Sequence, residues 1–213
     1  MGNYRNIRSY ENLERRIFVG TGAYDIPQLA PVHYEGGCEF IGFNFAKGCK
    51  TPRDKGVHFF VDDYQFNRLW TNIDRYIPML SQFRYVMTPD FSTYTDFPKA
   101  LQIYNHYRKH WVGAYLQEAG VAVIPTISWS TQDSFEWCFD GEPIGGTVAV
   151  SSVGCMKSIE SKQLFAEGYS EMVRRLHPEK IIFYGNVPPN CAGNIVRIKA
   201  FQDRFKEALC DGW

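Results

Sequence analysis

The chain lacks an excess of charge of either sign and any apolar run of membrane-spanning length. Lys and Arg together number 23, as do Asp and Glu, so the formal net charge is zero. Stable binding along duplex DNA needs a basic excess or a basic patch that neutralises many phosphates, so this balance disfavours it. No apolar run approaches the roughly 20 residues that cross a bilayer, so no membrane insertion is expected.

Paired cysteines and the common catalytic signatures are absent as well. The six cysteines show no C-x-x-C spacing, and the polar start Met1–Asn6 does not read as a signal peptide. We therefore expect mostly reduced thiols and a cytoplasmic protein. The sequence contains no G-x-x-x-x-G-K-[ST], G-x-G-x-x-G, G-x-S-x-G or H-E-x-x-H motif. This excludes a P-loop, a Rossmann dinucleotide site, a hydrolase nucleophile elbow and a zinc-protease helix of the usual kinds.

A metal site is not predicted either. His106 and His110 lie four residues apart on an expected helix, a spacing at which two imidazoles can share an ion. The intervening Tyr-Arg-Lys and the lack of a third ligand favour a solvated helix face instead. No metal ligands are assigned, and the sequence identifies neither a cofactor nor an oligomeric state.

The composition is that of one globular domain. Hydrophobic residues make up 45% and charged residues 22% of the 213 residues, enough for a full core in a single α/β domain over residues 1–213. Residues 1–23 are interpreted as an N-terminal arm or capping helix. Residues 46–56 form a glycine- and proline-punctuated basic loop, which is either solvated or a lid that reaches an anionic ligand through Lys47.

From the middle of the chain onward, apolar strand-like segments alternate with helix-like ones. This alternation predicts a parallel sheet of six or seven strands covered by helices. We favour a TIM-barrel-like sheet, closed or slightly trimmed, over a doubly wound open parallel sheet, because no Gly-rich first crossover or obvious edge strand is present. The predicted strands are 39–45, 57–61, 85–88, 121–126, 147–150 and 180–184, and the predicted helices are 66–80, 95–120, 132–139, 165–176 and 195–209.

Small and polar residues follow several of these strands. Parallel α/β folds place ligands beyond the carboxyl ends of their strands, so these residues should share one face. Asp90 and Asp62 are the candidate catalytic acid and base, and if they are neighbours, their like charges should raise one pKa. Asp63 is interpreted as the cap of the helix that follows it. Asp90 remains available for chemistry, because Thr95 or Asp96 can cap the next helix. The candidate ligand-binding residues on this face are Ser92, Ser128, Trp129, Ser130, Ser151, Ser152, Gly154, Tyr184, Gly185 and Asn186.

Two of these groups have a second interpretation. The turns Ser151–Gly154 and Tyr184–Asn186 could hold phosphate through backbone N–H groups, but tight strand-to-helix turns also need Ser and Gly. Trp129 could stack on a sugar or a base, or it could fill the core. Cys155 is interpreted as a small buried apolar residue rather than as a nucleophile.

Six segments follow one another along nearly the whole chain: 26–29, 41–44, 86–92, 125–130, 150–154 and 184–186. Together they resemble an uncharacterised domain-of-unknown-function family found in bacteria, plasmids and phages. The resemblance implies a mobile-element setting and carries no established activity. Some family members have replication-related labels, but the H-x-H metal motif of rolling-circle initiators is absent from this chain.

Three functions are compatible with the sequence. The first is binding of a nucleotide or a phosphorylated small molecule at the strand ends, with hydrolysis or transfer catalysed by Asp90 and Asp62. The second is a non-catalytic binding module that sequesters a nucleotide signal or docks on a host protein. The third is a replication or nucleic-acid accessory protein that uses the basic loop.

Overall fold

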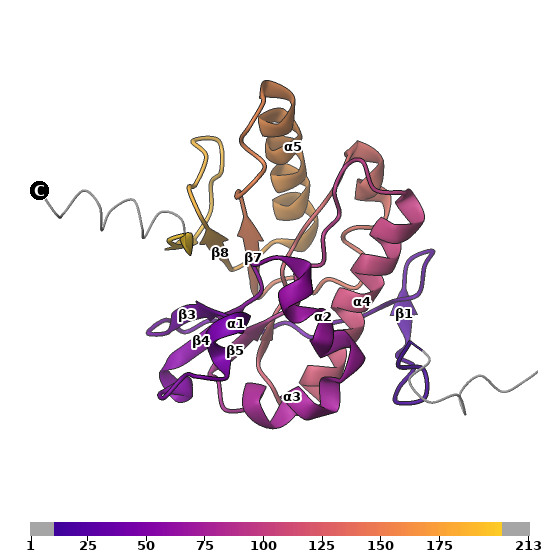
Figure 1. Ribbon diagram of the computed structural model, residues 1–213. Coiled ribbons are helices and arrows are strands. Elements are labelled where there is room, and N and C mark those ends of the chain that lie inside the picture. Colours follow the sequence, from indigo (N-terminus) through magenta and orange to yellow (C-terminus); the bar gives the residue numbers. More distant parts are fainter. Residues whose placement is uncertain (1–10, 202–213) are drawn as a thin grey trace, which may run out of the picture.

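A computed structural model describes residues 11–201, and its framework is seven parallel strands in two sheets (Figure 1). One sheet has the order β3-β4-β5-β6 and the other the order β7-β8-β9. A short antiparallel pair, β1 (Gly20–Thr21) and β2 (Ile26–Pro27), lies apart from them. The parallel strands are β3 (Glu39–Gly42), β4 (Lys55–His58), β5 (Tyr85–Met87), β6 (Val123–Ile124), β7 (Thr147–Ser151), β8 (Lys180–Tyr184) and β9 (Ile195–Ile198).

An isolated parallel bridge between Thr126 and Ala149 joins the two sheets. The N–H of Ile127 donates to the Ala149 carbonyl (2.7 Å), and the N–H of Ala149 donates to the Pro125 carbonyl (2.8 Å). The seven strands therefore follow one another in chain order, without the reversal that a doubly wound sheet requires. Within residues 11–201 no ladder pairs β3 with β9. The predicted α/β class with parallel strands is confirmed, whereas barrel closure through backbone pairing is not observed there.

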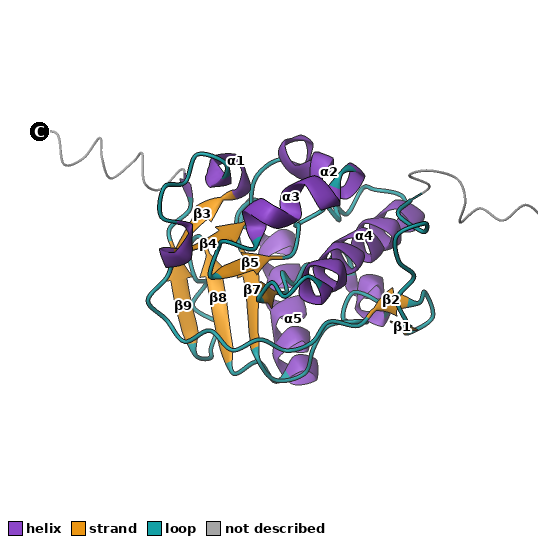
Figure 2. Ribbon diagram, turned by 90° about the horizontal axis from the view of Figure 1, so that it is seen from below, coloured by secondary structure: helices purple, strands orange, loops and turns teal. Residues whose placement is uncertain are grey.

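In Figure 2 the helices lie above the strands and to the right of them. Strand residues alternate between the two faces, as the two-residue period of a strand dictates. In β8, Ile181 and Phe183 pack with α5, whereas Ile182 and Tyr184 belong to the other core cluster. The helical elements are α1 (Phe43–Ala46), η2 (Pro52–Asp54), α2 (Asp63–Thr71), α3 (Ile73–Leu80), α4 (Lys99–Glu118), η3 (Gln132–Glu136) and α5 (Ile159–Leu176).

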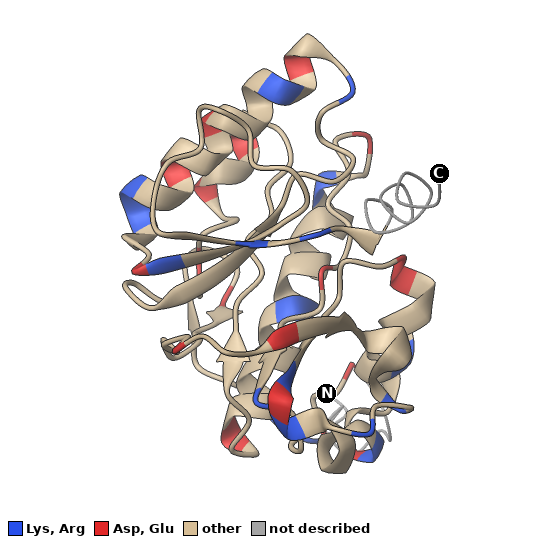
Figure 3. Ribbon diagram, turned by 90° about the vertical axis from the view of Figure 1, so that its left-hand side faces the viewer, with Lys and Arg blue, Asp and Glu red and all other residues tan. Residues whose placement is uncertain are grey.

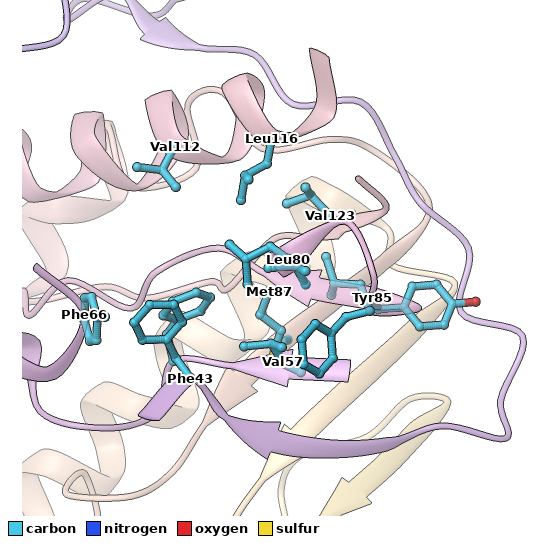
Figure 4. Close-up of a cluster of buried hydrophobic side chains, with 14 of the residues drawn as sticks. Phe43, Val57, Phe66, Leu80, Tyr85, Met87, Val112, Leu116 and Val123 are labelled. Carbon is cyan, nitrogen blue, oxygen red and sulfur yellow. The ribbon is translucent and has the colours of Figure 1, made fainter. Parts of the chain in front are cut away.

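The larger core cluster joins α4 to the first sheet. Val112 and Leu116 of α4 face Met87 and Val123 of the strands below, with Val57 deeper in the cluster (Figure 4). All five side chains are fully buried. Burial of each such side chain contributes about 1.5–3 kcal/mol of transfer free energy, so this contact fixes the strand ends against α4.

The N-terminal segment is packed against the helices rather than extended. Asn12 is buried, and its side-chain amide donates to the Trp70 carbonyl (2.9 Å). The Trp111 indole N–H donates to the Arg16 carbonyl (2.9 Å). The described part of the predicted arm therefore covers α2 and α4, while residues 1–10 lie outside the described residues.

Several predicted boundaries are wrong. The last predicted helix begins as strand β9, because the β-branched run Ile195–Ile198 pairs with β8; residues 202–209 lie outside the described chain. The helix predicted over 66–80 is two helices that meet at Asn72, whose φ of −142° and ψ of 46° are not helical. Helix α4 begins at Lys99 after Pro98, so neither Thr95 nor Asp96 caps it.

The predicted strand 39–45 and the basic loop 46–56 also change. The strand ends at Gly42, where α1 begins, and the loop ends in η2 before β4 begins at Lys55. The Lys55 ammonium pairs with the Glu39 carboxylate. Figure 3 shows acidic and basic residues interspersed over this side of the molecule, without a single basic stripe. No helix within residues 11–201 has both the length and the apolar character to span a membrane.

Gly56 should be required for the packing of β3 on β4. It is paired with Phe40, and a Cβ atom on Gly56 would lie 2.4 Å from the Phe40 ring. We expect Gly56→Ala to lower the free energy of unfolding by about 1–3 kcal/mol, as overpacking does in cores. Urea unfolding measures this, with Gly48→Ala as the control because its added Cβ meets nothing closer than 3.8 Å. Equal stability of the two variants would contradict the packing of Phe40 over Gly56.

Candidate functional site

A cavity of about 880 Å³ lies at the carboxyl ends of the parallel strands. This is the face on which the sequence placed the candidate site, and most of the predicted residues line the cavity. Ser152, Gly185, Asn186 and Lys47 do not line it. The predicted residues in its lining are Asp62, Asp90, Ser92, Ser128, Trp129, Ser130, Ser151, Gly154 and Tyr184.

Asp90 is the cavity carboxylate with the most altered acidity. The side chain is half-buried, and burial raises its pKa to about 7, against the opposing positive charge of Lys109. The like-charged neighbour that adds to the rise is Asp63. The sequence predicted that Asp62 would have this effect, but Asp62 is exposed at the mouth and has no such influence on Asp90.

Asp63 fixes the loop after β5. Its carboxylate accepts hydrogen bonds from the Ser92 N–H (3.1 Å) and the Ser92 hydroxyl (2.8 Å). The Asn105 side chain of α4 donates to the Ser92 carbonyl (2.6 Å). Asp63 is the first residue of α2, and the residue at its N-cap, Asp62, makes no side-chain cap bond. The predicted capping role of Asp63 is therefore wrong: its carboxylate holds the neighbouring loop, and that loop carries Asp90.

Three rings from the two sheets meet in the cavity. Phe60 stacks on Tyr184 with ring centroids 4.7 Å apart and an interplanar angle of 23°, and the His58 ring lies 4.8 Å from the same tyrosine. His58 ends β4, Phe60 follows it, and Tyr184 ends β8, so the row of strands curves until these ends touch. The Tyr184 hydroxyl accepts the Phe201 N–H (3.0 Å). Sequence reasoning missed His58 and Phe60, although a polar histidine inside the apolar segment 57–61 was the available signal.

Trp129 packs against the core with one part of its ring and lines the cavity with another. It packs on α5, where Gly168 leaves room for it: a Cβ there would lie 2.2 Å from the indole nitrogen. Its ring also contacts Phe165, with centroids 5.3 Å apart. The indole is nevertheless only half-buried and lines the cavity. Trp129 is thus a wall residue held firmly by the core.

Ser130 presents an unsatisfied polar group. Its hydroxyl is buried and has no hydrogen-bond partner among the described residues, although it lines the cavity. The N–H of Ser130 is bonded to the Ser134 hydroxyl (3.0 Å), which fixes the backbone there. A buried hydroxyl without a partner costs free energy, so this oxygen is ready to bond to a ligand.

The late turns are held by bonds within the protein. The Ser152 hydroxyl donates to the Asn186 carbonyl (2.7 Å), and the Gly185 N–H donates to the Ile198 carbonyl (2.9 Å). Gly185 has a φ of +99°, which favours glycine. The Asn186 side chain accepts from Arg197 (2.5 Å). These contacts match the tight-turn interpretation, and the cations in the cavity lining are Lys157 and Lys199, not Lys47.

The interpretation of His106 and His110 as a solvated helix face is wrong. Both rings are buried, as is Lys109 between them. Lys109 and His110 contact Glu142, which comes from the turn after η3 and is also buried. No pattern in the sequence indicates that this turn reaches α4. Cys155 is half-buried at the cavity, where burial raises the pKa of its thiol, in line with an unreactive cysteine.

Comparison with known proteins finds one family and two phage relatives. The profile of the domain of unknown function DUF4417 matches residues 18–202. The Gene 1 protein of Mycobacterium phage L5 is 39% identical over 175 residues, which cover 81% of this chain and 76% of that protein. The Gene 1 protein of Mycobacterium phage D29 is 35% identical over 204 residues, covering 93% and 75%. No solved structure matches. The expected resemblance to an uncharacterised family with phage members is confirmed.

The raised pKa of Asp90 predicts a pH-dependent stability. An unfolded aspartate has a pKa of about 3.9, so the folded protein binds this proton more tightly, and the free energy of unfolding should fall as pH rises from about 4 to about 7. Asp90→Asn lacks this contribution, so its stability relative to the wild type should rise over that range and level off above it. Urea unfolding at several pH values measures the difference. Asp96→Asn, an exposed change on the same loop, is the control, and a pH-independent difference for Asp90→Asn would contradict the burial of this carboxyl.

Proposed function

The chain belongs to this family of unknown function, and we propose that it binds a nucleotide or a phosphorylated small molecule in the strand-end cavity. The proposal includes hydrolysis of, or group transfer on, that ligand, with Asp90 as the proton-transferring group. The observation that supports it is that one cavity combines a carboxyl whose pKa is close to neutral pH, a wall of aromatic rings and a hydroxyl without a hydrogen-bond partner among the described residues.

The size and lining of the cavity support a ligand with a planar part. A volume of about 880 Å³ is within the range of about 300–1,000 Å³ that holds small organic ligands. Trp129, Phe60 and Tyr184 offer ring faces or edges on which a base can pack. The Ser130 hydroxyl would gain the hydrogen bond that no residue in the described part of the chain provides.

The charges at the cavity support a phosphate at its mouth. Lys157 and Lys199 are exposed there, where they can face an anion without being buried. Asp90 lies deeper, and a carboxyl with a pKa of about 7 can accept and return a proton near neutral pH. The zero net charge is compatible with one small anion and offers no long-range attraction for a duplex.

The strand order supports a trimmed barrel as the frame for this site. The seven strands run consecutively, and side chains of β4 and β8 touch across the row. In βα barrels the site is built from the loops after the strands, which is where this cavity lies. The barrel interpretation rests on the order of the strands and on their curvature.

Calorimetric titration with nucleoside mono- and triphosphates, the matching nucleosides and inorganic phosphate tests binding. We expect at least one nucleotide to bind and Trp129→Leu to weaken it roughly 5- to 150-fold, the effect of losing about 1–3 kcal/mol of base stacking. Tyr64→Leu is the matched control, because Tyr64 is exposed and outside the cavity. If none of these probes binds, the proposal is wrong.

Turnover of the bound nucleotide tests the catalytic part. Asp90→Asn should leave the ligand bound but lower the rate of product formation by about 10²-fold or more, the usual contribution of a general acid or base. Asp62→Asn, at the mouth, should act mainly on binding. A nucleotide that binds and is recovered intact after long incubation would identify a non-catalytic binding module instead.

A further inference from the structure

A second cluster of ionisable side chains is buried away from the cavity. His106 and His110 project from α4, and Glu142 reaches them from the turn that follows η3. One ligand atom from each of the three residues lies within 4.8 Å of the others. The side chains of His110 and Glu142 have no exposed surface, and His106 is 2% exposed. None of the three residues lines the strand-end cavity.

Both histidines are held as metal-binding histidines usually are. His110 Nδ1 lies 2.9 Å from the Pro27 carbonyl, and His106 Nε2 lies 3.0 Å from the Asp140 carbonyl. A carbonyl oxygen only accepts, so these two nitrogens carry protons, and each ring has one nitrogen left for another partner. Anchoring one nitrogen on a backbone carbonyl while the other binds the ion is the common arrangement of such rings.

Glu142 has one carboxylate oxygen that no residue between 11 and 201 satisfies. Its Oε1 accepts from Lys109 Nζ (2.7 Å) and lies 3.0 Å from His110 Nε2. Its Oε2 is buried and has no hydrogen-bond partner among the described residues. An unpartnered carboxylate oxygen in a dry interior is costly, and a bound cation would offset that cost.

We propose that His106, His110 and Glu142 bind a divalent transition-metal ion. Two imidazoles and one carboxylate match Zn²⁺ best, with the second carboxylate oxygen or a water as the fourth ligand. Zn–N and Zn–O bonds of about 2.1 Å place tetrahedral ligand atoms about 3.4 Å apart, so the three residues need only a small inward shift.

Lys109 can remain where it is when the ion binds. Its ammonium donates to the Thr126 carbonyl (2.8 Å) and would keep this bond. It would also donate a hydrogen bond to the Glu142 carboxylate from outside the metal's own ligands. The ion would then tie α4 and the turn at Glu142 to the segment at Pro27, which is anchored on His110. Its role is structural, and it is separate from the chemistry proposed for Asp90.

Titration of the full-length protein with Co²⁺ and Zn²⁺ tests the site. We expect one equivalent of Co²⁺ to give the intense visible absorption of a four-coordinate ion, and one equivalent of Zn²⁺ to displace it. The chain has five histidines, and in ¹⁵N-histidine NMR spectra of the wild type only His106 and His110 should respond to Zn²⁺. This second measurement needs no variant, so it holds even where a variant fails to fold.

Variants then assign the ligands. Glu142→Gln and His106→Gln should each weaken Zn²⁺ binding more than tenfold, whereas His33→Gln, a change at an exposed histidine paired with Glu179, should leave it unchanged. No four-coordinate Co²⁺ spectrum, or a Zn²⁺ response at His33, His58 or His177 in place of the buried pair, overturns the proposal. Either result identifies the cluster as a charged hydrogen-bond network without an ion.

Discussion

The structure depends on the hydrogen bonds that converge on Thr126, where the first sheet meets the second. The Thr126 N–H donates to the Thr88 hydroxyl (2.8 Å), and the Thr126 hydroxyl donates to the Thr88 carbonyl (3.0 Å). Both threonines are buried, so each bond lost here would leave a polar group unsatisfied in the core. The bridge to Ala149 begins at the same residue. One residue thus sets the spacing of three strands.

The positions of three cavity residues follow from this spacing of the strands. Asp90, Ser128 and Ser151 each lie two positions beyond one of the bridging residues Thr88, Thr126 and Ala149. Because strand side chains repeat their direction every second residue, fixing the bridge also brings these polar side chains to the same end of the strands. Lys109 donates to the Thr126 carbonyl from the opposite side, so the junction also connects the cavity to the buried histidine cluster.

Local pattern was enough to predict the strands and their polar ends. The apolar runs before Asp90, Ser128 and Ser151 each stop at a small or polar residue, and parallel strands share a carboxyl edge, so co-location followed from the class alone. Local pattern misled at Ile195–Ile198, where pairing with β8 overrides an amphipathic reading. The position of Asp63 beside Asp90 was also missed, because it depends on how α2 packs.

Contacts between distant parts of the chain could not be predicted. Glu142 lies 32 residues beyond His110 in the sequence, and nothing in the turn that carries it indicates that it will enter the core beside α4. Without a third ligand in view, the two histidines looked like surface residues. Tyr184 and Phe60 meet only because seven strands curve, and no periodicity along one strand carries that information.

The contact of Phe60 with Tyr184 has a mechanical consequence. On one side the two sheets are joined by directional backbone hydrogen bonds, which fail if the strands separate by an ångström. On the other side they meet through stacked rings, whose dispersion attraction varies gently as the rings slide past one another. The two sheets are therefore held rigidly at the bridge between Thr126 and Ala149 and less rigidly at the stacked rings of Phe60 and Tyr184. The contact between these two rings sets the width of the cavity.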